Sequence, residues 1–154
     1  MDNYVIGFDP GKTTGCVALV VTDLAKLEYD LAAKYALPWS DRSQIRDILS
    51  AFSKAGSINA VVVEDYIIYP HMAQEHIGAT LWSTKIIGRL EVYCEELELD
   101  QLVTFQMAKD LYLRKGIKFP IPSEHFRLLP SPHMRDAYLH ARIWIMKQRF
   151  QVIK

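Results

Sequence analysis

Three acidic residues stand where an expected buried strand ends or an expected helix begins. Asp9 ends an apolar run and precedes a Pro-Gly pair, Glu64 ends a valine-rich run, and Asp136 falls in the first turns of the last expected helix. A carboxylate at the buried end of a strand costs free energy unless it has a partner. Hard divalent cations prefer carboxylate oxygens, so three carboxylates delivered by separate elements predict a metal site.

A site of this kind suits the hydrolysis of phosphodiester bonds. Two divalent cations about 4 Å apart can make a water nucleophilic and stabilise the leaving oxygen. Asp9 is the natural bridging ligand, although an aspartate before Pro-Gly can also cap its own turn. Asp136 has a simpler alternative role, which is to stabilise the helix N-terminus. Glu64 and Asp65 point to opposite sides of a strand, so only one of them can face the site.

The hydrophobic pattern predicts the elements that must bring these acids together. We expect strands at 4–9, 15–21, 28–37, 58–64 and 102–105. We expect helices between 40 and 56 and at 77–97, 107–114 and 133–149, and an extended loop over the proline-rich stretch 118–132. Gly11 and Gly15 should supply turn freedom in the first hairpin, Ser40 should cap the first helix, and Ser131-Pro132 should start the last one.

Length and composition predict one compact domain spanning residues 1–154, because half of the residues are hydrophobic and no linker or repeat interrupts them. The first residues lack the basic and apolar regions of a signal peptide, and no apolar stretch is long enough to span a bilayer. Cys16 and Cys94 fall in an expected strand and an expected helix, so no disulfide framework is predicted. Together these features predict a soluble cytoplasmic protein without a membrane partner.

The net charge of zero conceals a segregation of charge along the chain. Up to residue 105 there are 8 Lys/Arg against 15 Asp/Glu, and from residue 106 onward there are 10 against 3. A basic segment of this kind indicates a surface that faces a polyanion, although a solvated basic tail balancing an acidic body would give the same counts. Basic residues close in sequence to the carboxylates favour nucleic acid as the partner.

The order of the expected elements is that of the ribonuclease H-like fold, an α/β fold with a central mixed five-stranded sheet and helices on both faces. Three motifs then resemble the RuvC-type Holliday junction resolvases: Gly7-Phe-Asp-Pro-Gly-x-x-x-Thr-Gly15, Val61-Val-Val-Glu64 and His133-Met-Arg-Asp136-Ala137. The resemblance covers nearly the whole chain. It implies a crossover junction endodeoxyribonuclease that cleaves four-way DNA junctions as a symmetric homodimer, with Mg²⁺ or Mn²⁺ as cofactor. The small size would suit a phage-type member.

The resemblance also assigns individual residues. It favours Glu64 over Asp65 as the ligand of the second strand. It implies that the last helix closes the metal site with two residues three apart, which here are His133 and Asp136. His133 would then act as a ligand or as the group that handles the proton of the water. Family members tend to carry a basic residue after the last strand, aimed at the scissile phosphate, and Lys109 occupies that place.

Further residues are candidates for contact with DNA. Basic side chains near the predicted site would bind the phosphate backbone without reading sequence. Tyr66 and Tyr69 follow Glu64 and could stack on a base of an opened junction. His140 lies one helical turn beyond Asp136 on the same face but belongs to none of the motifs. The basic candidates are Lys12, Lys109, Arg114, Lys115 and Lys118.

The sequence is also compatible with other functions. The opening motif also resembles the phosphate-binding hairpin of actin-like sugar kinases and chaperone ATPases. Those proteins need two lobes to enclose a nucleotide, whereas 154 residues provide one. Nucleases of the same fold that process structured RNA are the main alternative, and they can work as monomers. A binding module without catalysis is disfavoured because all three acids are present.

Overall fold

The computed structural model describes residues 1–66 and 73–152, with side chains for 1–66 and 82–151. Five strands form one sheet in the order β3-β2-β1-β4-β5. Their bounds are β1 (Asn3–Asp9), β2 (Thr13–Asp23), β3 (Glu28–Pro38), β4 (Ser57–Asp65) and β5 (Val103–Met107). The first three strands are antiparallel neighbours, whereas β4 and β5 run parallel to β1. The expected mixed five-stranded sheet is therefore confirmed.

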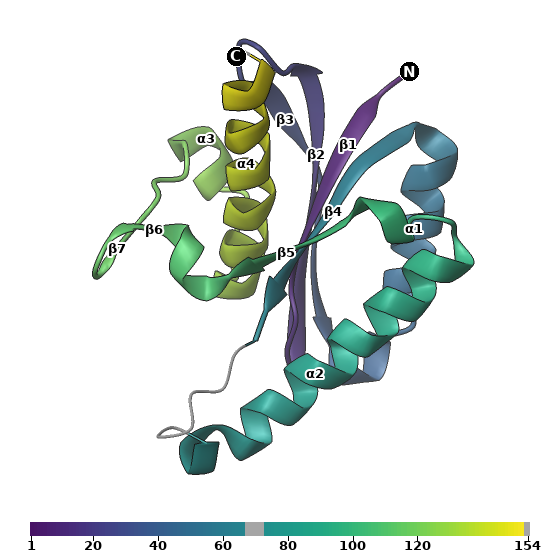
Figure 1. The fold of residues 1–154 in the computed structure, drawn as a ribbon, viewed down its shortest axis with the longest axis vertical. Helices are drawn as coiled ribbons and strands as arrows, with labels where there is room; N and C mark the ends of the chain where they lie inside the picture. The colour runs from purple at the N-terminus through teal and green to yellow at the C-terminus, as the bar shows by residue number, and fades with distance from the viewer. Residues whose placement is uncertain (67–72, 153–154) are drawn as a thin grey trace.

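Helices cover both faces of this sheet (Figure 1). α1 (Gln44–Ala55) and α2 (Ala73–Glu96) lie against one face, and α4 (Pro132–Val152) lies against the other. Each face has its own apolar core, which gives the valine-rich β4 cover on both sides. No helix in residues 1–66 and 73–152 is both long and apolar enough to cross a membrane.

The alternation of side chains along β4 decides which acid meets α4. Val61 and Val63 pack in the core beneath α1 and α2, whereas Val62 packs in the core beneath α4. Successive side chains of a strand point to opposite faces. Glu64 therefore shares the α4 face with Val62, and Asp65 shares the opposite face.

Glycine lets α4 approach β1 and β2 closely. A Cβ at Gly7 would lie 2.1 Å from the carbonyl oxygen of Ala137, and one at Gly15 would lie 2.0 Å from that of His133. Gly15 is a buried residue within β2, where it pairs with Asp9. The prediction that Gly15 supplies a turn is therefore wrong, because its lack of a side chain instead brings the first turn of α4 onto the end of β1.

The short elements differ from the sequence-based expectations in three places. The stretch 107–114 is not one helix: it forms the 3-10 helix η4 (Ala108–Leu111) and then β6 (Tyr112–Arg114). β6 pairs with β7 (Ile117–Lys118), and Gly116, with a φ of 78°, turns the chain between them. The proline-rich stretch holds a single-turn helix, α3 (Ser123–Phe126).

The third difference concerns the start of the first helix. Ser40 lies inside the 3-10 helix η1 (Trp39–Asp41), and α1 begins only at Gln44. Ser40 therefore does not cap α1, because the chain makes a separate tight turn before the helix starts. A further 3-10 helix, η3 (Asp100–Leu102), precedes β5.

Candidate metal centre

Three carboxylates meet at one end of the sheet, the lower end in Figure 1. Asp9 is the last residue of β1, Glu64 lies near the end of β4, and Asp136 lies early in α4. One oxygen from each carboxylate lies within 4.8 Å of the corresponding oxygens of the other two. We call these residues the acid cluster. Residues 55 or more positions apart in sequence are thus brought into ligand distance of one cation.

The crowding of the three carboxylates changes the pKa of Asp9 most strongly. Burial, together with the negative charges of Glu64 and Asp136, raises the pKa of Asp9 to about 8. The side chain is only 15% exposed, so water screens it poorly. Without a cation, Asp9 therefore holds a proton near neutral pH and can donate it in a hydrogen bond to Glu64.

Glu64 remains ionised because of a buried histidine on α4. Burial alone would raise its pKa, but a hydrogen bond from His140 and the charge of that ring outweigh burial and hold the pKa of Glu64 below its ordinary value. His140 Nε2 lies 3.0 Å from Glu64 Oε2, and His140 Nδ1 lies 2.9 Å from Gln106 Oε1. Neither His140 nor Gln106 is exposed to solvent by more than a few per cent.

Asp136 is paired with a lysine from β7. Lys118 Nζ donates to Asp136 Oδ1 at 2.7 Å. Burial would lower the pKa of Lys118, but the hydrogen bond and the charge of Asp136 exceed that effect and raise it. The positive charge also reaches Asp9 and Glu64, where it lowers the pKa of both. Lys118 therefore partly neutralises the acid cluster.

His133 lies beside the acid cluster on the first turn of α4. Its Nδ1 is 3.1 Å from Asp9 Oδ2, and its side chain is 45% exposed. The backbone N–H of His133 donates to Ser131 Oγ at 3.2 Å, which confirms that Ser131 caps this helix. The ring can thus reach both Asp9 and solvent, as a ligand or a proton carrier must.

The donor set fits a hard divalent cation. Three carboxylate oxygens converge, and their mutual repulsion retains a proton that a cation would displace. Asp9, Glu64 and Asp136 would hold such an ion, with His133 as a further ligand candidate on the solvent side. Magnesium and manganese both match oxygen ligands of this kind.

Several predicted residues lie outside the acid cluster. Asp65 points to the opposite face of β4 and is not a member of the acid cluster. Lys109 is exposed on η4, and among residues 1–66 and 82–151 the lysine that contacts the acid cluster is Lys118 instead. Tyr66 follows β4, whereas Tyr69 lies outside the described residues. Lys12 is exposed on the β1–β2 turn, Arg114 is exposed at the end of β6, and Lys115 is exposed on the turn that follows it.

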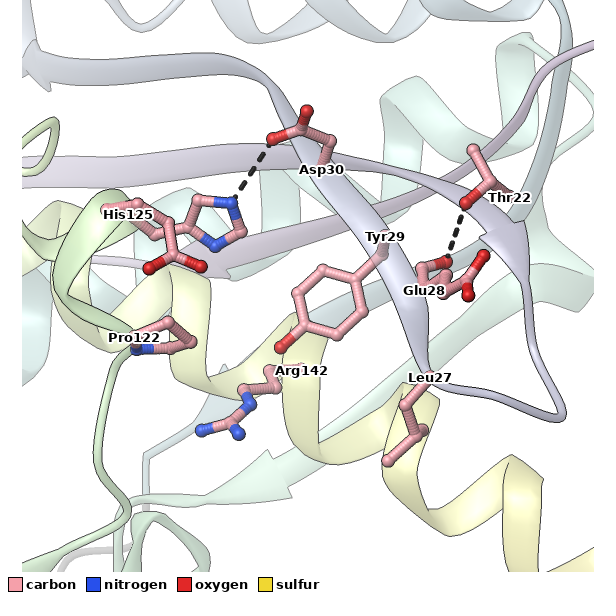
Figure 2. Close-up of a pocket in the computed structure, with 9 residues that line it drawn as sticks. Thr22, Leu27, Glu28, Tyr29, Asp30, Pro122, His125 and Arg142 are labelled. Carbon is pink, nitrogen blue, oxygen red and sulfur yellow. Dashed lines mark hydrogen bonds and ion pairs between the residues drawn. The ribbon is translucent and has the colours of Figure 1, made fainter.

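A cavity lies away from the acid cluster, at the other end of the sheet and close to the turn between β2 and β3 (Figure 2). It measures about 430 Å³ and is lined by Thr22, Asp30, His125 and Arg142 among others. His125 Nε2 lies 3.2 Å from Asp30 Oδ1, and His125 Nδ1 lies 2.6 Å from the hydroxyl of Tyr138. This cavity contains no member of the acid cluster.

Comparison with known proteins places the chain by its fold alone. No protein-family model matches it, and no curated protein matches it in sequence. Two solved structures from Thermus thermophilus superpose on it, each with 96% of this chain and 96% of the other covered. RuvC in complex with a Holliday junction substrate gives a TM-score of 0.65 at 18% identity, and a second RuvC structure gives 0.70 at 16%.

The chain has the fold of RuvC. The ribonuclease H-like architecture predicted from the element order is thereby confirmed, as is the resemblance to RuvC at the level of the fold. Identity of 16–18% carries the likeness no further than the fold.

The close approach of α4 at Gly15 gives a first prediction. We expect Gly15→Ala to lower the free energy of unfolding by about 1–3 kcal/mol, because the new methyl group would collide with a backbone carbonyl. The helix start must move to relieve the clash, so affinity for Mn²⁺ should fall as well. Chemical denaturation and calorimetric titration measure the two effects.

The matched control is Gly88→Ala in α2, where an added Cβ meets nothing within 4 Å. That variant should bind Mn²⁺ as the wild type does and gain up to about 1 kcal/mol of stability from helix propensity. Equal Mn²⁺ affinity in Gly15→Ala and wild type would show that the close approach is not needed to place the acids.

Proposed function

We propose that this protein is a metal-dependent, structure-specific endodeoxyribonuclease that resolves four-way DNA junctions. The observation that carries the proposal is the convergence of Asp9, Glu64 and Asp136 within 4.8 Å on a RuvC fold. One of the two RuvC structures was solved with a Holliday junction substrate, which makes branched DNA the first substrate to test.

Each residue has a role in phosphodiester hydrolysis. When bound, divalent cations supply a nucleophilic water and stabilise the leaving oxygen. The acid cluster holds them at the end of the sheet. His133 touches Asp9 through Nδ1, which leaves Nε2 free to exchange a proton with a water on the exposed side. Lys118, beside Asp136, adds a positive charge next to the expected position of the phosphate.

In this proposal the DNA backbone runs along the β6–β7 hairpin. It carries Arg114, Lys115 and Lys118, all exposed, and it leads directly to the acid cluster through the Lys118–Asp136 ion pair. The hairpin projects beside α4 and away from α1 and α2 (Figure 1). The basic character of the sequence beyond residue 105 thus has a defined place next to the proposed metal centre.

We further propose that the active form is a homodimer. A four-way junction presents two equivalent strands for cleavage, and one chain offers a single acid cluster among its described residues. A two-fold symmetric dimer would present one site to each strand. Light scattering of the purified protein, alone and with a junction, measures this directly.

The decisive experiment incubates the purified protein and Mg²⁺ or Mn²⁺ with labelled four-way DNA, linear duplex DNA of the same sequence, and a folded RNA. We expect paired cuts in the four-way DNA that disappear with a chelator. Cleavage of the RNA with the junction left intact would favour the alternative, a nuclease for structured RNA. No cleavage of any substrate with either metal would refute a nuclease.

The proposed DNA path gives a second prediction. We expect Arg114→Ala with Lys115→Ala to weaken junction binding and to reduce the slope of log K against log salt by about 1–2, because each side chain releases about one counterion. Fluorescence anisotropy over a range of salt concentrations measures both. A matched control is Arg46→Ala, whose side chain pairs with Glu96 on α2, across the sheet from α4. An unchanged slope in the double variant would remove the hairpin from the DNA path.

A further inference from the structure

His140 is a fully buried imidazole with a partner at each nitrogen. It follows Asp136 by one turn of α4, and its relative exposure is 0%. Nε2 lies 3.0 Å from Glu64 Oε2, and Nδ1 lies 2.9 Å from Gln106 Oε1. The ring therefore links the edge strand β5, the helix α4 and the acid cluster.

The donor and acceptor roles follow from the chemistry of the partners. An ionised carboxylate can only accept, so His140 Nε2–H donates to Glu64. The amide of Gln106 meets Nδ1, and because an amide offers both a donor and an acceptor it can satisfy that nitrogen with or without a proton. The tautomer that presents Nε2–H to Glu64 is thus compatible with the surroundings of the ring.

The register of the sheet places Gln106 where it can contact His140 beside Glu64. Gln106 of β5 is paired directly with Glu64 of β4, so the two side chains stand next to each other on the face covered by α4. Gln106 is only 4% exposed. Two polar side chains are therefore buried beside a core of valine, alanine and leucine, where an apolar pair would cost less free energy.

We propose that His140, itself held by Gln106, is a positioning residue that orients the Glu64 carboxylate for cation binding. The proposal rests on the function proposed above in one respect, namely that the acid cluster holds a cation. Groups that fix metal ligands in this manner contribute about 10–100-fold to metal affinity. His140 itself need not touch the ion, since its Nε2 is occupied by the carboxylate oxygen.

The test measures Mn²⁺ affinity by calorimetry in the absence of DNA. We expect His140→Leu, which fills the site but cannot donate, to bind Mn²⁺ about 10–100-fold more weakly than wild type. His140→Gln, whose amide nitrogen can replace Nε2 as a donor, should recover most of the loss. Gln106→Met should show a smaller loss, because it releases the ring without removing it.

The matched control is His125→Leu at the other end of the sheet. His125 is also a buried histidine with a partner at each nitrogen, one of them an acid, but it touches no member of the acid cluster. Its replacement should leave Mn²⁺ affinity unchanged while lowering thermal stability. Melting curves recorded in a chelator show whether each variant is folded.

Wild-type affinity in folded His140→Leu would overturn the proposal and make His140 a packing residue. If that variant does not fold, wild-type affinity in Gln106→Met would overturn it instead. A third outcome separates the two proposals. If the wild type binds Mn²⁺ but cleaves no junction, and His140→Leu binds Mn²⁺ more weakly, the proposed function is refuted and this inference stands. A wild type that binds no Mn²⁺ would refute the inference and the metal site alike.

Discussion

Asp9→Asn is expected to abolish cleavage and, in the absence of metal, to stabilise the protein. The substitution removes a carboxylate of the acid cluster while preserving the shape of the side chain. Loss of metal-assisted catalysis removes several kcal/mol of transition-state stabilisation, which corresponds to about 10³-fold or more in rate. Junction binding should persist, because no basic contact is lost.

The stability gain follows from the raised pKa of Asp9. In the unfolded chain the carboxyl has its ordinary pKa of 3.8, whereas burial and the neighbouring acids raise the pKa in the fold to about 8. Between these values the folded state holds a proton that the unfolded state has lost. The contribution of Asp9 to the free energy of unfolding of the metal-free wild type therefore falls as pH rises, by up to about 1.4 kcal/mol per pH unit.

Asparagine has no proton to lose, so the variant should escape this fall. Thermal melting in a chelator should give the two proteins similar stability near pH 4 and a growing advantage for Asp9→Asn toward pH 8. Asp65→Asn is the matched control, because Asp65 lies next to Glu64 but faces the other side of β4. It should retain cleavage and the wild-type dependence on pH. A cleaving Asp9→Asn variant would reject the acid cluster as the active site.

The residues of the acid cluster can be predicted from sequence because each follows the regular side-chain spacing of a strand or a helix. Asp9 and Glu64 each follow an apolar run, and parallel neighbouring strands bring such ends together. Asp136 was placed by the helical spacing from His133 and by the capping pair before it. Alternation along β4 also separates Glu64 from Asp65, but only once the side of the sheet that α4 covers is known.

The sequence does not predict contacts that depend on how separate elements pack together, because no helical or strand periodicity indicates them. Lys118 lies in a stretch interrupted by prolines, and only the β6–β7 pairing carries it back to Asp136. Gln106 reads as an ordinary strand residue until its register with Glu64 is known. The one signal for His140 in the sequence is its position one turn after Asp136, which predicts that both lie on the same face of the helix but identifies no partner for His140.

Gly15 shows that a glycine in a sequence can indicate either a turn or a close approach between two elements. A glycine six residues after Asp9 in a short hairpin predicts a turn, because glycine tolerates backbone conformations that other residues avoid. In the fold Gly15 lies in extended backbone inside β2. The residue matters there because it has no Cβ, and a Cβ would collide with the carbonyl oxygen of His133. Only the packing of α4 on the sheet distinguishes these roles.

Metal affinity is expected to depend steeply on pH. With the pKa of Asp9 raised to about 8, a cation must displace a proton at lower pH before Asp9 can act as a ligand. The dissociation constant for Mn²⁺ or Mg²⁺ should therefore rise about tenfold for each unit that the pH falls below 8 and level off above it. Glu64 adds little to this dependence near neutral pH, because its pKa is held low.

The proton itself can be counted. Calorimetric titration at pH 7 in buffers of different ionisation enthalpy should show close to one proton released for each cation bound at the Asp9 site. Asp9→Asn should bind more weakly, release no proton from that position and lose the steep dependence on pH. The same affinity at pH 6 and pH 8 would mean that Asp9 is already ionised in the metal-free fold, and that the crowding of the three carboxylates is relieved by something other than a proton. If Asp9 holds this proton, the affinity for the cation and the stability of the metal-free protein must both change with pH below about 8, because the same group titrates in both measurements.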